Sequence, residues 1–178
     1  MHKSIACNTF GVKQNLQLDS QLCFALYAAS RAVTSAYRDV LSELDLTYPQ
    51  YLTLLALWEE DGVTISALGA RLQLDSGTLS PLLKRLDGAG LVERRRSSED
   101  ERRVTVHLTP SGSDLREHAD QVQRRALSSV DLTSTEIDTL RTLAKRLCDS
   151  VAAEQTLQTR SPRAVADPNS HPDQQGAK

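Results

Sequence analysis

Cys23 has the clearest chemistry in this sequence, because three tyrosines lie at spacings that suit a reactive thiol. Tyr27 follows it by four residues, so on a helix the two side chains share one face. Tyr37 lies further along the same predicted helix, and Tyr48 opens the next one. The thiolate is the form that reacts with peroxide, and phenol hydroxyls can stabilise it by hydrogen bonding. From spacing alone a peroxide-reactive cysteine stays open, although a buried, inert role is the commoner one for a cysteine on a helix.

Tyr37 lies fourteen residues beyond Cys23, which corresponds to about 21 Å along one helix. Its hydroxyl therefore cannot reach the thiol of its own chain, whereas antiparallel packing of two copies would bring it to the thiol of the other copy. The remaining cysteines, Cys7 and Cys148, are interpreted as bystander thiols. Three cysteines at these positions fit neither a disulfide framework nor zinc-ligand spacing.

A second group of residues suits contact with DNA. The segment after Asp75 has one narrow apolar stripe, which predicts a helix with a single buried face. Small, hydroxylated and basic side chains suit the major groove, and a helix start with free N–H groups suits a phosphate. An ordinary solvated surface is the alternative. The candidate DNA-contacting residues of this recognition helix are Ser76, Gly77, Thr78, Pro81, Lys84 and Arg85.

Residues 91–108 alternate between apolar and polar around a charged centre, which predicts a two-stranded hairpin, or wing. At its tip, Arg102 or Arg103 could enter the minor groove, with Asp100 bracing the arginine. The whole chain has 21 basic and 23 acidic residues, but residues 84–103 hold seven basic and five acidic groups. A local basic surface is therefore expected on an acidic body. A solvent-exposed loop with internal ion pairs is the alternative.

These residues must be positioned by a series of helices around the hairpin. Three short helices followed by a two-stranded wing form a winged helix-turn-helix, so the expected fold class is mainly α. Long helices before and after it leave apolar stripes that a second copy would cover. The expected helix starts are Leu18, the capping box Thr47-Tyr48-Pro49-Gln50, Thr64, Asp75 or Ser76, Thr109-Pro110, and a second capping box at Thr133-Ser134-Thr135-Glu136.

The chain of 178 residues is expected to have one ordinary globular core. No apolar run approaches the roughly 20 residues of a membrane-spanning helix, and no secretory signal is evident, so a cytoplasmic protein is expected. The expected organisation is a flexible N-terminus (1–17), dimerisation helices (18–46 and 110–153), a winged helix-turn-helix DNA-binding region (47–109) and a disordered tail (154–178).

The segment DSGTLSPLLKRL (75–86), with residues 90–92, 100–103 and 108–112, resembles the DNA-binding signature of the MarR family of dimeric winged-helix repressors. The resemblance covers roughly residues 18–150. It implies a homodimer on an inverted-repeat operator in double-stranded DNA, with one recognition helix per half-site. The stretch QLCFALY (21–27), together with Tyr37, 46–52 and 57–59, resembles the organic-hydroperoxide-sensing branch of that family, OhrR.

In that branch a cysteine is oxidised by organic hydroperoxide to sulfenic acid, and the dimer releases DNA. The resemblance implies that Cys23 is the peroxidatic residue and that Tyr37 and Tyr48 of the other subunit orient it. Tyr27 would assist from its own helix.

Some members of the branch close an intersubunit disulfide through a second cysteine, but the corresponding stretch, residues 126–129, contains none. We therefore expect the oxidised Cys23 to be capped by a small cellular thiol. A cyclic sulfenamide, or a disulfide with Cys7 or Cys148, stays open.

Other functions remain open at this stage. A MarR-type repressor could instead release DNA on binding a small phenolic ligand between its domains, with Cys23 structural. A thiol peroxidase would need catalytic partners that the sequence does not offer, so no enzyme activity and no cofactor are expected. A scaffold that binds no DNA is the remaining alternative, and it would lack the salt dependence that phosphate contacts produce.

Overall fold

The computed structural model describes residues 16–96, 103–128 and 130–160. The chain divides into two compact units, Met1–Ser129 and Val130–Lys178, which are described separately. Within the described residues, no helix combines the length and apolar character needed to cross a membrane.

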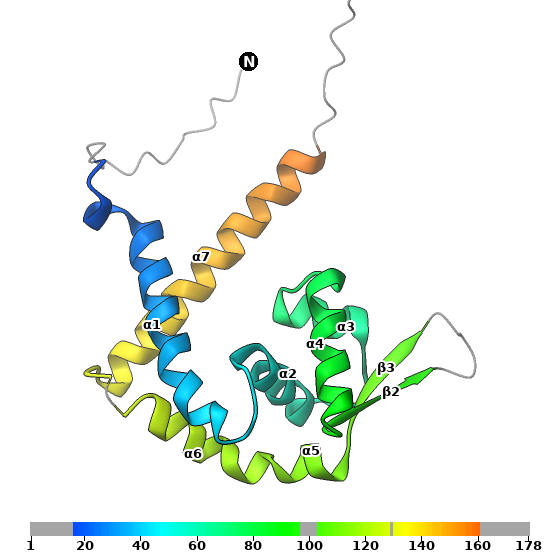
Figure 1. Cartoon of the computed structure of the whole chain (residues 1–178). Coiled ribbons are helices and arrows are strands. Elements are labelled where there is room, and N and C mark those ends of the chain that lie inside the picture. The colour runs from blue at the N-terminus through cyan, green and yellow to red at the C-terminus, as the bar shows by residue number, and fades with distance from the viewer. Residues whose placement is uncertain (1–15, 97–102, 129, 161–178) are drawn as a thin grey trace, which may run out of the picture. The chain divides into compact units, whose positions relative to one another are not determined.

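The first unit contains helices, three short strands and one 3-10 turn (Figure 1). The turn comes first, and helix α1 follows it. The elements in order are η1 (Leu18–Ser20), α1 (Leu22–Ser42), α2 (Tyr48–Glu59), β1 (Val63–Thr64), α3 (Ile65–Leu72), α4 (Ser76–Gly88), β2 (Val92–Arg96), β3 (Val104–Leu108), α5 (Pro110–Asp114) and α6 (Arg116–Ala126).

Helices α2, α3 and α4 with the strands form a winged helix-turn-helix, which confirms the predicted fold class. The sheet is antiparallel in the order β1-β3-β2, so it has three strands where the sequence predicted two. Strand β1 pairs Val63 with Val106 and Thr64 with Thr105. Two residues are too few to show an alternating pattern in the sequence, and this explains why β1 was missed.

The predicted start of the first helix at Leu18 is wrong, because Leu18–Ser20 form a 3-10 turn and the extended backbone of Gln21 separates it from α1, which begins at Leu22. The later helix starts follow their predicted caps. In the first capping box, the Thr47 N–H donates to Gln50 Oε1 at 2.8 Å, and this contact fixes the start of α2. Thr64 caps α3, and Asp75 caps α4 by accepting from the Thr78 N–H at 2.9 Å. Each cap satisfies backbone donors that the first turn of a helix leaves free.

The core lies among α1, α2, α3, α4 and the sheet. Its fully buried members are leucines at helical spacing, together with two valines of the strands, as the apolar periods predicted. They include Leu41, Leu54, Leu57, Leu68, Leu79, Leu83, Leu86, Val92 and Val106.

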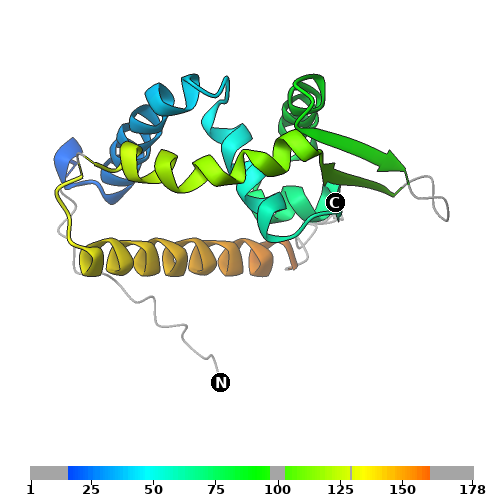
Figure 2. The same ribbon diagram turned by 90° about the horizontal axis from the view of Figure 1, so that it is seen from below.

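One predicted helix is divided. The helix expected from Pro110 breaks at Leu115 into α5 and α6, which follow one another end to end (Figure 2). The break lies three residues after Gly112, whose carbonyl accepts a hydrogen bond from Trp58 Nε1 at 2.8 Å. A Cβ at Gly112 would meet the Leu91 carbonyl oxygen at 2.0 Å, so α5 lies directly against the chain before β2.

The second unit is described as one helix, α7 (Ser134–Arg160). Its predicted capping box is present, because the Thr133 N–H donates to Glu136 Oε2 at 2.8 Å. The predicted disordered tail from residue 154 is wrong for residues 154–160, which are helical. The prolines that suggested disorder begin only at Pro162, whereas the alanine, glutamate, glutamine and leucine before them favour helix.

Candidate functional site

Cys23 is the second residue of α1, and its thiol is exposed. Tyr27, one turn further along, has 56% of its side chain exposed. The Tyr27 hydroxyl accepts a hydrogen bond from Arg31 Nη1 at 3.1 Å, and the guanidinium lies 5.6 Å from the centre of the tyrosine ring. This half of α1 also exposes large apolar side chains, including Leu22 at 63% and Val33 at 37%.

Tyr37 and Tyr48 are brought together by the ends of two helices. Their ring centroids are 5.0 Å apart, with Tyr37 buried near the end of α1 and Tyr48 half-buried at the start of α2. The capping box at Thr47 fixes the start of α2 and therefore the position of Tyr48.

Tyr51 extends this cluster, and the predicted set did not contain it. Its ring lies 5.9 Å from that of Tyr37 and 6.3 Å from that of Trp58, and its hydroxyl donates to the Ala119 carbonyl at 3.3 Å. The sequence held a signal for it, because Tyr51 follows Tyr48 by three residues and therefore shares its helix face.

Burial makes these phenols harder to ionise. It raises the pKa of Tyr37 to about 12, and the neighbouring Tyr51 and Tyr48 hydroxyls add to the rise. Burial also raises the pKa of Tyr48 and of Tyr51. A tyrosine is already protonated at neutral pH, and burial moves the ionisation of these phenols further into the alkaline range.

The predicted redox group is only partly assembled within one chain. The structure joins Tyr37 with Tyr48, whereas Cys23 and Tyr27 lie near the opposite end of α1. This separation agrees with the expected distance of about 21 Å along the helix.

The predicted recognition helix has the expected two faces. Its leucine stripe is buried, and Ser76, Gly77, Thr78, Pro81, Lys84 and Arg85 are exposed. Among the residues that the structure describes, Lys84 and Arg85 form no ion pair. The Thr78 hydroxyl already donates a hydrogen bond to Asp75 Oδ2 at 3.0 Å. Contact of these residues with DNA stays a prediction.

The arginines of the wing differ in the ion pairs that they form. Arg94 binds Asp87 Oδ2 through Nε at 3.1 Å and Nη2 at 2.9 Å, and Arg95 pairs with Glu93 on its own strand. Arg103 is exposed at the start of β3. Asp100 and Arg102, the other predicted wing-tip residues, lie outside the described residues.

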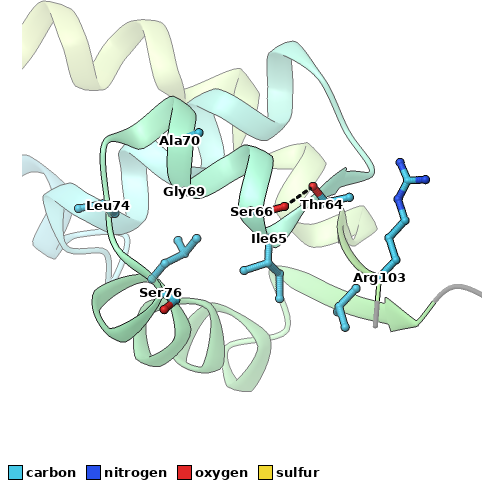
Figure 3. A pocket seen from close by; sticks show the side chains of 10 residues that line it. Thr64, Ile65, Ser66, Gly69, Ala70, Leu74, Ser76 and Arg103 are labelled. Carbon is cyan, nitrogen blue, oxygen red and sulfur yellow. Dashed lines mark hydrogen bonds between the residues drawn. The ribbon is translucent and has the colours of Figure 1, made fainter. Parts of the chain in front are cut away.

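A hollow of about 730 Å³ lies between the starts of α3 and α4 and the strand β3 (Figure 3). Its polar lining consists of Thr64, Ser66, Ser76 and Arg103, and the hydroxyls of Thr64 and Ser66 lie 3.1 Å apart. Apolar side chains complete the lining, among them Ile65, Leu74, Leu79 and Val104. The hollow therefore combines apolar surface with hydroxyl groups and one cation.

Comparison with known proteins places this geometry in a family. A family model described as transcriptional regulator SarA/Rot matches residues 35–120. The organic hydroperoxide resistance transcriptional regulator of Bacillus subtilis (strain 168) is 51% identical over 105 residues, which cover 59% of this chain and 71% of that protein.

Two solved structures extend the comparison. Reduced AbfR bound to DNA is 37% identical with a TM-score of 0.65, and the match covers 80% of this chain and 93% of AbfR. A crystal structure of MarR is 27% identical with a TM-score of 0.62 over 74% of this chain and 98% of MarR. The chain belongs to the MarR family.

This MarR-family protein is a DNA-binding transcriptional regulator, and it groups with the organic hydroperoxide resistance regulators, as its residues indicated. The relatives named above are transcriptional regulators rather than enzymes. In the part of the chain that the structure describes, no cluster of three or more histidine, cysteine, aspartate or glutamate side chains could hold a metal ion.

Proposed function

We propose that this MarR-family regulator is a homodimeric repressor that binds an inverted-repeat operator and releases it when an organic hydroperoxide oxidises Cys23. The observation that carries the proposal is the division of the redox group: an exposed thiol at one end of α1 and a preassembled Tyr37–Tyr48 pair at the other. Two antiparallel copies of α1 would join the two halves.

The exposed apolar residues of each unit support a dimer. In the first unit, Leu18 and Leu22 are 59% and 63% exposed. In the second unit, α7 exposes a stripe of Leu140, Leu143, Leu147 and Val151 at helical spacing. These side chains are only partly exposed, so covering each one contributes about half of the ~1.5–3 kcal/mol of a full burial. An isologous dimer covers the same side chain on both subunits.

The oxidation step is a displacement at oxygen. The Cys23 thiolate attacks the distal oxygen of the hydroperoxide, the O–O bond breaks, and the alkoxide takes a proton and leaves as an alcohol. The sulfur then carries a sulfenic acid. The hydroxyls of Tyr37 and Tyr48 of the partner subunit, which are protonated at neutral pH, donate hydrogen bonds to the thiolate and to the departing oxygen.

The fate of the sulfenic acid follows from the available thiols. Condensation with a small cellular thiol forms a mixed disulfide and releases water. The added group is bulkier and more polar than the thiol, and a close-packed interface cannot absorb it in place. The helices that carry the tyrosines then move, and the two recognition helices lose the spacing that matches the operator.

The test uses the full-length reduced protein on an inverted-repeat duplex that this protein selects from a random library. Addition of cumene hydroperoxide with a small thiol should release the DNA, and Cys23→Ser should bind equally well but ignore the peroxide. Release of DNA by the Cys23→Ser variant would show that the sensor assignment is wrong. Mass spectrometry of Cys23, with Cys148→Ser alongside, assigns the oxidised product.

The hollow beside α4 favours a second candidate function, because its volume lies in the range of small-molecule sites, about 300–1,000 Å³. Its hydroxyls and Arg103 suit a small phenolic ligand, and binding there would compete with DNA. In that case Cys23 is structural, peroxide leaves the complex intact, and a phenolic compound alone releases the operator.

A further inference from the structure

His107 lies at the base of the wing and faces an acceptor on each side of its ring. Its Nδ1 is 3.4 Å from Asp61 Oδ2, and its Nε2 is 3.0 Å from the Thr105 hydroxyl. The ring lies against Gly62, where a Cβ would meet His107 Cε1 at 2.9 Å. The close approach of Gly62, which has a φ of 73°, fixes the plane of the ring and the direction of both nitrogens.

The two outer members of this group are tied to the backbone of the wing. Asp61 Oδ1 accepts from the Leu108 N–H at 2.8 Å. The Thr105 hydroxyl donates to the Arg95 carbonyl of β2 at 3.3 Å. The chain of contacts therefore links the loop after α2 to β3 and then to β2.

The hydrogens of this group can be counted. The Thr105 hydroxyl has one hydrogen, which it can direct to the Arg95 carbonyl or to His107 Nε2. When that hydrogen is directed to the Arg95 carbonyl, Nε2 must supply the hydrogen between His107 and Thr105. Nδ1 must also carry a hydrogen if it is to bind the Asp61 carboxylate favourably. Only the doubly protonated, cationic imidazolium satisfies every contact.

Loss of one proton breaks one of these links. A neutral His107 that keeps its hydrogen on Nδ1 accepts at Nε2, so the Thr105 hydroxyl must turn away from the Arg95 carbonyl. A neutral ring with its hydrogen on Nε2 places a lone pair against the Asp61 carboxylate. The protonation state of His107 therefore decides whether all of these contacts are made at once.

We propose that Asp61, His107 and Thr105 are positioning residues that hold the base of the wing for DNA binding, and that protonation of His107 tightens this hold. The proposal rests on the proposed function, because it requires the wing to contact DNA. Arg103 lies two residues before Thr105, immediately before β3 and towards the tip of the wing, so a firmer base places its guanidinium more reproducibly. The added positive charge also favours the phosphates.

Other charged groups lie on the elements that pack around β3, and they also contribute to the electrostatic environment of the His107 ring. Glu93 lies directly opposite His107 in the β2–β3 ladder, and it is already paired with Arg95. Within the described residues, Asp61 is therefore the carboxylate that contacts the imidazole directly. The charged residues of the other elements that pack on β3 are Glu59 at the end of α2, Arg71 of α3 and Asp114 of α5.

The test measures operator affinity of the full-length reduced protein by fluorescence anisotropy at constant salt, between about pH 6 and pH 8. The parent should bind more tightly at the lower pH. In Asp61→Asn, which keeps an oxygen for the Leu108 N–H, this pH dependence should shrink by about threefold. His107→Gln should give the same flattened profile, whereas His118→Gln, on α6, should keep the profile of the parent.

The outcomes separate the two proposals. A parental pH profile in both Asp61→Asn and His107→Gln overturns the inference, and so does an equal loss of affinity at every pH, which a merely structural role would produce. Arg103→Ala tests the wing contact itself. If Arg103→Ala binds like the parent, the wing contact and the present inference fail together, while the Cys23 peroxide test is unaffected.

Discussion

The phenol rings of Tyr37 and Tyr48 lie 5.0 Å apart, with their planes inclined at 51°, although they belong to different helices. Tyr37 comes from the end of α1 and Tyr48 is the first residue of α2, so the turn between the two helices brings the rings together. Their placement does not require a second subunit. In the proposed dimer, the second subunit would therefore need only to bring its thiol to a pair of donors that already exists.

Removing either hydroxyl should slow the oxidation of Cys23. A hydrogen bond to a charged group contributes about 1.5–3 kcal/mol, so Tyr37→Phe or Tyr48→Phe should lower the rate of sulfenic acid formation by about tenfold or more. Stopped-flow trapping of the sulfenic acid measures this rate. Tyr51→Phe is the matched control, because the Tyr51 hydroxyl is already bound to the Ala119 carbonyl. An equal slowing in all three variants would contradict the assigned roles.

Alkaline pH should destabilise the protein through Tyr37. In the unfolded chain tyrosine ionises near pH 10, whereas burial raises the pKa of Tyr37 to about 12 in the folded protein. Between these values the unfolded state binds fewer protons, so the free energy of unfolding falls as the pH rises. Absorbance titration of tyrosinate should show a late step that Tyr37→Phe removes. A titration unchanged by that substitution would contradict the prediction.

Pro81 lies inside α4 and cannot donate a hydrogen bond to the Gly77 carbonyl. Pro81→Ala restores that donor and should raise the free energy of unfolding by about 1–3 kcal/mol. Ser80→Ala, at the adjacent exposed position, should gain only a few tenths of a kcal/mol from helix propensity. Urea unfolding of the three proteins measures both differences. Operator affinity should fall in Pro81→Ala if the ring contacts a base, so a gain in stability with unchanged affinity would remove Pro81 from the DNA-contacting set.

Two glycines should respond oppositely to alanine. Gly112→Ala places a methyl group 2.0 Å from the Leu91 carbonyl oxygen. Because that oxygen belongs to the backbone and cannot easily move away, the substitution should lower the free energy of unfolding by about 2–3 kcal/mol or more. A Cβ at Gly88, near the end of α4, meets no atom within 4 Å, so Gly88→Ala should gain up to about 1 kcal/mol. The fluorescence of Trp58, whose indole donates to the Gly112 carbonyl, should change only in the first variant.

Local chemistry explains which parts of the fold the sequence could predict. The caps at Thr47, Thr64 and Asp75 each depend on residues within three positions, and all three are present. The leucine stripe of α4 was predicted for the same reason, because a helical period is visible in a short window. Strand β1 depends instead on pairing with β3, far along the chain, and no local pattern reveals it.

The same distinction applies to the site. The spacing of Cys23 and Tyr37 was enough to predict that this thiol and this phenol lie apart within one chain, whereas the corresponding role of Tyr48 was implied by the family resemblance. Tyr51 was not among the predicted site residues, because its contact with Tyr37 depends on the angle between α1 and α2. The contact of Asp61 with His107 joins a loop to a strand, and no local sequence pattern connects the two residues.

The capping box at Thr47 and Gln50 anchors Tyr48 to the first turn of α2, and the same helix packs against α4. Twelve helical residues span about 18 Å. In the proposed mechanism, a sideways displacement of the phenol at one end would tilt the whole helix, whose side packs against the proposed recognition helix. We expect such a rigid-body tilt to need no hinge or unfolding step, so that the chemistry at sulfur limits the speed of the response.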